Sequence, residues 1–209
     1  MSLFLGKIHY WLYNKIVWLE VIEEEIIRWA KEVNLPIEEW IQQVYSEYGM
    51  PTGNKSLEEI IDTSNIHGWL QDRIASAEAR QAALITRIIG ENSEYKNDLL
   101  SLFSKQGAVA ASKYEGEINM PEDAYNALND YILEGMPCDR VNELLENNEK
   151  EFIWQTSICL HKPYWEKVSG DVQNFYILRE AWIKSFIETI KPDFRFVKVA
   201  DNIQKIERR

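Results

Sequence analysis

Titratable side chains that could do chemistry fall on apolar stretches at two places in the chain. In the first, His67 and Glu78 stand 11 positions apart on a predicted helix. At about 100° per residue this spacing brings the two side chains within roughly 20° of each other, so both are expected to face inward. The spacing predicts a polar pocket with Glu78 as a base or ligand and His67 as a donor. The structural alternative is a histidine bonded to backbone and a glutamate paired with Arg73 or Arg80.

The second place is Cys159-Leu160-His161, at the end of a stretch with the alternating pattern of a β-strand. Residues two apart on a strand project to the same face, so the thiol and the imidazole are expected to be neighbours. Such a pair can activate a thiolate nucleophile or offer two ligands to a metal. In the structural alternative, Cys159 is a small buried apolar residue and His161 begins the turn into Lys162-Pro163.

Together the two places predict one candidate site. Its catalytic residues are Cys159, His161 and Glu78, and its ligand-binding residues are His67, Gln71 and Trp165. Titratable groups on otherwise buried faces are typical of functional pockets. We therefore expect a small-ligand-binding protein or a hydrolase-like enzyme with a buried polar pocket. The pattern identifies neither the substrate nor a cofactor, and it leaves open whether the protein is an enzyme.

Two other classes of function fit the same residues. In a helical interaction or scaffold protein, the polar groups only fix how helices pack. In a metalloprotein, His9 joins His67 and His161, because histidines from separate elements can build a metal site. The spacing is too irregular to assign metal ligands. Cys138, before a predicted helix start, is a second candidate thiol or a plain loop residue ahead of a cap at Asp139.

Composition restricts the partners and the compartment. The 209 residues are 45% hydrophobic, enough to bury a core. Against 23 basic residues stand 34 acidic ones, and the net charge of -11 repels nucleic acid and anionic membrane surfaces. Two cysteines fit a reducing compartment, so we expect a cytoplasmic protein. Charges interrupt the apolar N-terminal segment Met1–Trp29, which therefore predicts neither a signal peptide nor a membrane span. Phosphate-loop, Rossmann and zinc motifs are absent from the sequence.

The first two thirds of the chain have the three- to four-residue apolar period of amphipathic helices. Pro36 suits a helix start, Ser56 with Glu59 forms a capping box, and Pro121 opens another helix. Gly49–Lys55 is the clearest loop. The expected helices cover 5–33, 36–48, 56–89, 95–116 and 121–134.

The pattern changes in the last third. A short helix with Leu144 and Leu145 on its apolar face is expected after Asp139. Alternation predicts strands at 151–160 and 194–199, and Asp171 caps a helix that ends at Lys191-Pro192. Because a lone pair of strands is marginal in water, either that helix covers the pair or further strands are hidden in residues predicted to be helical.

The sequence thus predicts a predominantly helical α+β fold. An N-terminal helical bundle packs on a smaller C-terminal unit with an antiparallel strand pair and a covering helix. Residues 1–91 form the helical region and residues 92–209 the mixed α+β region, unless the two are one continuous domain. Long amphipathic helices rich in aromatic residues are also compatible with a homodimer.

The C-terminal half further resembles a known domain in four features. They are the small-residue helix Gly107-Ala108-Val109-Ala110-Ala111, the turn at Gly135-Met136, the strand Phe152 to Cys159, and the Trp182 helix that leads to Phe194–Val199. This pattern resembles the small-molecule-binding domain shared by 4-vinyl-reductase-type proteins and the L-2-amino-thiazoline-4-carboxylic acid hydrolase-like family. In that family a cysteine commonly follows the strand that Cys159 ends, so the resemblance implies a role for Cys159.

Overall fold

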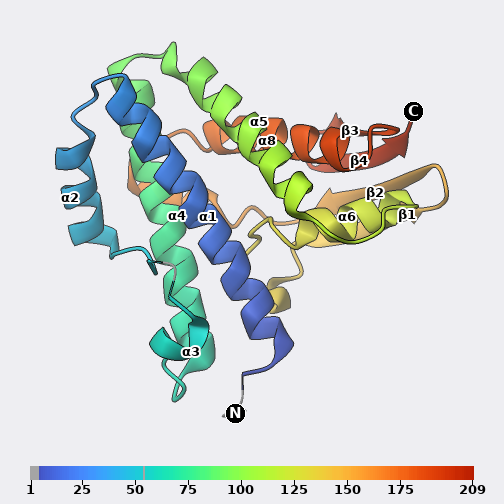
Figure 1. The fold of residues 1–209 in the computed structure, drawn as a ribbon, viewed down its shortest axis with the longest axis horizontal. Helices are drawn as coiled ribbons and strands as arrows, with labels where there is room; N and C mark the ends of the chain where they lie inside the picture. Colours follow the sequence, from blue (N-terminus) through green and yellow to red (C-terminus); the bar gives the residue numbers. More distant parts are fainter. Residues whose placement is uncertain (1–4, 54) are drawn as a thin grey trace. The chain divides into compact units, whose positions relative to one another are not determined.

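The computed structural model describes residues 5–53 and 55–209 and confirms a predominantly helical α+β fold. Residues 1–4 of the N-terminal segment and residue 54 of the predicted loop lie outside the described residues. The chain forms two compact units (Figure 1). The first unit contains the chain up to Lys96 together with His161–Val172, and the second contains Asn97–Leu160 and Gln173–Arg209. Nothing in the sequence indicated that residues 161–172 join the first unit.

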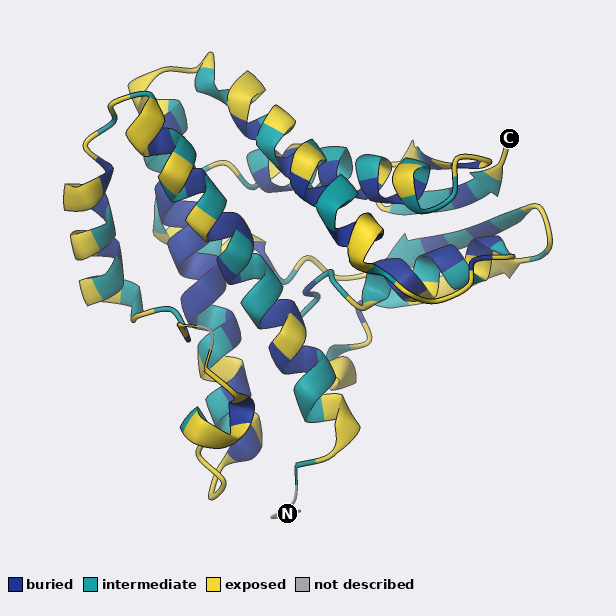
Figure 2. Cartoon of the chain, in the orientation of Figure 1, coloured by how far each residue is buried: buried dark blue, intermediate teal, exposed yellow. Residues whose placement is uncertain are grey.

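The first unit is built of helices around α4. Its helices are α1 (Lys7–Glu32), α2 (Ile37–Tyr48), α3 (Leu57–Ile60), α4 (Ile66–Glu91) and α7 (Lys162–Lys167). Within this unit α4 contacts α1, α2 and α7. Every residue of α4 from Ser76 to Ile85 is buried, as the continuous dark band in Figure 2 shows. A helix covered on all sides must pair its polar side chains inside the protein.

The predicted long helix from Ser56 is wrong, because the chain forms two helices there. The capping box is present, and Ser56 donates its backbone N–H to Glu59 at 2.8 Å. However, α3 lasts one turn and ends at Ile60, and the backbone of the next residue, Ile61, is extended. Asp62 then accepts the backbone N–H of Ser64 in a turn, and Asn65 caps α4 by accepting the N–H of Gly68 at 3.2 Å. Side-chain bonds of this kind compete with helical backbone bonds and stop the helix.

The second unit combines helices with an antiparallel sheet. Its helices are α5 (Tyr95–Lys113), α6 (Pro121–Asn129), α8 (Val172–Ile190) and a short 3-10 helix, η1 (Pro137–Asp139). The first two residues of α5 and the first residue of α8 belong to the first unit. The strands are β1 (Asn142–Asn147), β2 (Glu151–Thr156), β3 (Phe194–Ala200) and β4 (Ile203–Arg208), in the spatial order β1-β2-β4-β3. Within the described residues, no helix combines the length and apolarity that a membrane span needs.

The sheet corrects two predictions. Strands β2 and β3 lie where strands were predicted, although β2 already ends at Thr156. The predicted helix with Leu144 and Leu145 is wrong, because these residues belong to the edge strand β1, which pairs with β2. Strand β4 was missed because only Ile206 of its six residues is buried. A strand with few buried residues lacks the apolar alternation on which the prediction depends.

One face of the sheet carries an aromatic core. Phe152 and Trp154 of β2 are buried together with Phe194 and Phe196 of β3. Tyr125 of α6 stacks on Phe152, with 4.3 Å between ring centroids. Because strand residues alternate between faces, Thr156 continues this inner face beyond Trp154. The inner face therefore changes from aromatic to polar at the end of β2.

Helices α5 and α8 approach closely at Gly107. A Cβ atom at this position would lie 2.2 Å from the backbone oxygen of Trp182, closer than any real contact. The small-residue helix that includes Gly107 thus allows two backbones to meet.

Gly107→Ala is expected to destabilise the protein by about 1–3 kcal/mol, because the backbones must separate to admit the methyl group. Gly90→Ala is the matched control, since a Cβ there meets nothing within 4 Å and alanine favours a helix by up to about 1 kcal/mol. Urea unfolding followed by circular dichroism measures both. Equal effects of the two substitutions would contradict the close approach at Gly107.

Candidate functional site

The first unit holds a buried ionic cluster around Arg80. The Arg80 side chain is fully buried, and its Nε and Nη2 donate to Glu23 at 2.9 Å and to Glu20 at 2.8 Å. Its Nη1 donates to the Ser76 hydroxyl at 2.7 Å. Glu20 also accepts the backbone N–H of Thr52 at 2.9 Å. All three nitrogens of the guanidinium are therefore engaged within the protein, as expected of a structural ion cluster.

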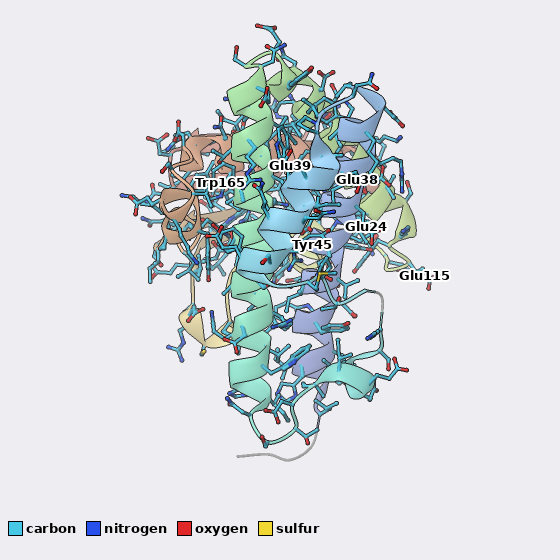
Figure 3. All side chains as sticks on the ribbon, turned by 90° about the vertical axis from the view of Figure 1, so that its left-hand side faces the viewer. Glu24, Glu38, Glu39, Tyr45, Glu115 and Trp165 are labelled. Atoms are coloured by element: carbon cyan, nitrogen blue, oxygen red, sulfur yellow. The ribbon has the colours of Figure 1, made fainter. Side chains whose placement is uncertain are left out.

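This cluster contains two carboxylates for one guanidinium. Burial raises the pKa of Glu23, and the charge of Arg80 only partly opposes this effect. Burial and the neighbouring Glu23 raise the pKa of Tyr45, whose hydroxyl hydrogen-bonds to Glu23. Figure 3 shows Tyr45 on the α2 side of α4 and Trp165 on the α7 side. The cluster thus joins α1, α2 and α4.

Two predicted catalytic residues, Glu78 and His161, meet on the other side of α4. The His161 Nδ1 lies 3.0 and 3.1 Å from the two carboxylate oxygens of Glu78, and the side chains are only 2% and 3% exposed. Glu78 is therefore paired with a histidine and not with Arg73 or Arg80. His161 is the N-terminal cap residue of α7, and Trp165 of that helix is 1% exposed. The pair and Trp165 attach α7 to α4, out of reach of solvent.

The predicted ligand-binding residues His67 and Gln71 are both exposed, so the inward orientation predicted for His67 is wrong. His67 lies in the first turn of α4, beyond the covered stretch that contains Glu78. His67 and Glu78 therefore differ in burial although their spacing on the helix points them in a similar direction. The His67 ring lies 5.7 Å from the ring of His9, whose Nδ1 accepts the backbone N–H of Gly6. Among the described residues, no group of three or more His, Cys, Asp or Glu side chains could hold a metal ion.

Cys159 and His161 do not share a strand face as predicted. Strand β2 ends at Thr156, after which Ser157 donates its N–H to the backbone oxygen of Val141 at 2.8 Å. Cys159 is exposed, whereas His161 is buried in the first unit. The Tyr176 hydroxyl interacts with the Cys159 thiol within the second unit. Cys138 is also exposed, on the 3-10 helix η1.

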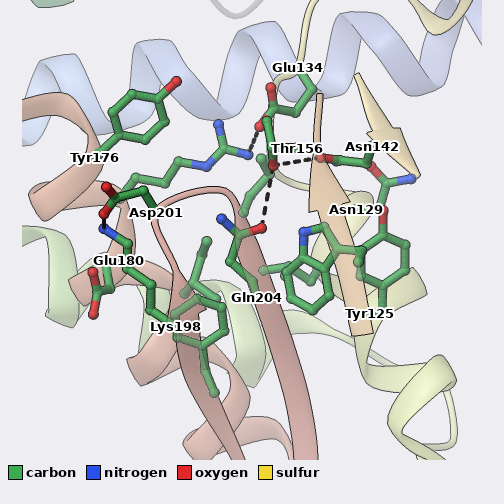
Figure 4. Close-up of a pocket in the computed structure, with 16 residues that line it drawn as sticks. Tyr125, Asn129, Glu134, Asn142, Thr156, Tyr176, Glu180, Lys198, Asp201 and Gln204 are labelled. Atoms are coloured by element: carbon green, nitrogen blue, oxygen red, sulfur yellow. Dashed lines mark hydrogen bonds and ion pairs between the residues drawn. The ribbon is translucent and has the colours of Figure 1, made fainter. Parts of the chain in front are cut away.

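The second unit contains two adjoining pockets. The larger pocket has a volume of about 330 Å³ and includes Cys159 in its wall. The smaller pocket, shown in Figure 4, has a volume of about 70 Å³ and is lined by residues of α6, β1, β2, α8, β3 and β4. Five residues line both pockets: Thr156, Tyr176, Lys198, Asp201 and Gln204. The pockets therefore meet at the polar end of the inner sheet face.

A hydrogen-bond network crosses the smaller pocket (Figure 4). The Thr156 Oγ1 lies 2.9 Å from the Asn142 Oδ1 and 3.3 Å from the Gln204 Oε1. The amide of Asn142 also hydrogen-bonds to the Tyr125 hydroxyl. Burial raises the pKa of Tyr125 despite the opposing effect of this bond, so the hydroxyl stays protonated at neutral pH.

The charged residues of the smaller pocket are mostly paired with each other. Arg179 of α8 forms an ion pair with Glu134, and both side chains are more than four-fifths buried. Lys198 and Asp201 pair at 3.5 Å, with the Asp201 side chain open to solvent. Glu180 adds a third carboxylate. The lining thus has three acidic and two basic side chains, and no net positive charge.

Of the predicted site residues, only Cys159 reaches either pocket. The residues that sequence reasoning missed include Tyr125, Asn142, Thr156 and Gln204. The alternation of β2 placed Thr156 on the same face as Trp154, which was an available signal. Asn142 and Gln204 had none, because they lie on β1 and β4, the two strands that the sequence did not reveal.

The pH dependence of stability tests the ionic cluster. Because folding raises the pKa of Glu23, the folded state binds a proton more tightly, and the contribution of Glu23 to stability is lost as pH rises through the folded pKa. Glu23→Gln imitates the protonated form. The free energy of unfolding of the variant minus that of wild type, measured by urea unfolding, is expected to be larger at pH 7 than at about pH 5.

Glu24→Gln is the control for this comparison, because Glu24 is the exposed neighbour of Glu23 on α1. It is expected to change the free energy of unfolding by less than about 0.5 kcal/mol at either pH. If the free energy of unfolding of Glu23→Gln minus that of wild type increases as the pH falls, the pKa of Glu23 is not raised by folding.

His161→Ala tests whether the Glu78–His161 pair holds the first unit together. The substitution leaves a buried carboxylate without its partner and is expected to cost about 3–5 kcal/mol. Adding Glu78→Gln neutralises that carboxylate and should recover part of the loss. Chemical unfolding followed by tryptophan fluorescence measures both variants. A loss below about 0.5 kcal/mol for His161→Ala would show that the pair is dispensable for stability.

Comparison of the chain with models of protein families, with curated proteins and with solved structures finds no match. The resemblance of the C-terminal half to 4-vinyl-reductase-type domains therefore stays a prediction. The function has to be inferred from the geometry of the two units. In that geometry, the first unit encloses the Arg80 cluster and the Glu78–His161 pair, and the second unit opens polar groups to a pocket.

Proposed function

We propose that the second unit binds a small molecule in its two adjoining pockets. One observation carries the proposal: polar side chains from several elements converge on a cavity of about 330 Å³ that continues into a smaller one. Small-molecule sites typically have volumes of about 300–1,000 Å³, with mostly apolar walls and a few placed polar groups. The larger pocket has this volume but is lined mainly by polar residues, and the smaller pocket supplies the apolar walls, with Trp154, Phe196 and Ile183 beside its amides and hydroxyls.

The placement of polar groups supports binding over a purely structural role. The Thr156 network lies where the aromatic inner face ends, and its partners come from β1, β2 and β4. Fixed polar groups beside aromatic walls give a ligand both orientation and contact area.

The burial of two predicted catalytic residues favours ligand binding over the predicted hydrolysis. Glu78 and His161 are 3% and 2% exposed, so a substrate does not reach them without local opening of the first unit. Cys159 is the one predicted catalytic residue in a pocket wall, and there it contributes a contact to the ligand. The proposal is therefore a binding unit whose contacts come from the sheet, α6 and α8.

A pair of substitutions on β2 tests the proposal. Thr156 lines both pockets, and Thr156→Trp is expected to fill their junction and weaken binding at least tenfold. Gln155→Trp places the same side chain on the opposite face of the same strand, where neither pocket lies, and should leave binding unchanged. The probe is a fragment library of neutral, anionic and cationic compounds, and binding is measured by chemical shifts of the ¹⁵N-labelled full chain.

The expected result is a set of fragments that shift signals of the pocket residues in wild type and Gln155→Trp but not in Thr156→Trp. Circular dichroism confirms that both variants fold. A library without any pocket binder, or binding that survives Thr156→Trp, would refute the proposed function.

A further inference from the structure

We infer that the ligand presents a neutral carbonyl oxygen to the smaller pocket, and that the Tyr125 hydroxyl donates to this oxygen. The inference rests on the proposed function and specifies its ligand class. It predicts a small planar molecule with a ketone, amide or lactam group, carrying no charge at that end. Four features of the pocket lead to it: the direction of its hydrogen bonds, the state of Tyr125, its balance of charge, and its shape.

The direction of the network follows from Thr156. A threonine hydroxyl has one proton and so donates one hydrogen bond, and its shorter contact, 2.9 Å, is with the Asn142 Oδ1. The Gln204 Oε1 lies farther from the Thr156 Oγ1, at 3.3 Å. The NH₂ group of Asn142 therefore points away from Thr156, toward other groups in the pocket.

The next bond in the network leaves Tyr125 as a donor. With its oxygen accepting from Thr156, the Asn142 amide bonds to Tyr125 through its NH₂ group, so the phenolic oxygen accepts. The phenolic proton is then not used in this bond. Among the described residues, the Tyr125 hydroxyl makes no hydrogen bond other than that with the Asn142 amide. The Tyr125 hydroxyl therefore requires an acceptor, and a carbonyl oxygen supplies one with its lone pairs.

Charge balance distinguishes a carbonyl from a carboxylate. The two basic residues of the smaller pocket, Arg179 and Lys198, are already paired with Glu134 and Asp201. Glu180 leaves the lining with one more acidic than basic side chain. An anionic ligand would lose its hydration without gaining an unpaired positive partner, which costs more than desolvating a neutral oxygen. A cationic head would be attracted by Glu180, but it would bring a further donor to the Tyr125 hydroxyl, whose proton needs an acceptor.

The shape of the pocket indicates a ligand with a flat body and a small head group. The ring centroids of Tyr125 and Trp154 are 4.9 Å apart, and those of Trp154 and Phe196 are 6.1 Å apart, so aromatic rings form one continuous wall. The volume of about 70 Å³ holds a head of only a few heavy atoms, since a water molecule occupies about 30 Å³. The remaining body extends past Gln204 into the larger pocket.

Three probes of similar size test the inference: acetophenone, benzoate and benzylamine. They share a benzene ring and differ in a neutral carbonyl, an anionic and a cationic head. Each is titrated into the ¹⁵N-labelled full chain while the side-chain amide signals of Asn142 and Gln204 are followed. Acetophenone is expected to shift both signals and to bind at least threefold more tightly than either charged probe.

Tyr125→Phe then tests the donor itself. The variant keeps the ring that stacks on Phe152 and removes only the hydroxyl, so acetophenone binding should weaken about threefold to tenfold, the effect of one neutral hydrogen bond. Tyr131→Phe is the matched control, because Tyr131 belongs to the same unit but lines neither pocket. It should leave the affinity unchanged.

The outcomes separate the inference from the proposed function. If benzoate or benzylamine shifts the amide signals at lower concentration than acetophenone, the carbonyl inference is overturned and the site remains a ligand site. Equal acetophenone affinity of wild type and Tyr125→Phe overturns the role of Tyr125. If none of the three probes shifts the signals, the inference fails, and the broader library decides the proposed function.

Discussion

The first unit depends on the pairing of charge inside α4. This helix is covered on all sides from Ser76 to Ile85, so its polar side chains have no access to water. Arg80 on one side and Glu78 on the other are each satisfied by partners from distant segments, α1 in one case and the residue before α7 in the other. Removing one partner of such a pair costs more than the pair itself contributes, because an isolated charge stays behind. The same contacts that stabilise the helices therefore also specify which helices surround α4.

The second unit uses its polar groups differently. Along the inner face of β2, Phe152 and Trp154 belong to the aromatic core, and Thr156 belongs to the pocket. The alternation of β2 that places aromatic residues in the core thus also places the Thr156 hydroxyl at the edge of that core. Asn142 and Gln204 flank Thr156 because β1 and β4 pair with β2 on either side. Sheet register, and not local sequence, brings these three polar residues together.

This difference explains how much the sequence could predict. Helical period placed α1, α2, α5 and α8 well and found α6, although α6 ends at Asn129 and not at residue 134, and alternation found β2 and β3. Glu78 was correctly predicted to face inward, but its partner His161 was assigned to a strand that had already ended. The end of α3 depends on side-chain bonds at Asp62 and Asn65, within the polar run 62–65, across which the prediction had continued a single helix. Strands β1 and β4 bury too little to produce a period, so the pocket that they complete could not be predicted.

Burial alone therefore does not identify a functional residue in this protein. Glu78 and His161 combine the residue types and the burial typical of a catalytic pair, yet each satisfies the other and no described cavity reaches them. Tyr125 is an unremarkable residue by type, but the direction of its neighbours' hydrogen bonds leaves it a proton to donate. A polar group whose bonds are complete within the fold contributes to stability, whereas one with a remaining donor beside a cavity can contribute to recognition. By this criterion, the capacity of the chain to recognise another molecule lies in the second unit, at the pocket formed by α6, α8 and the sheet.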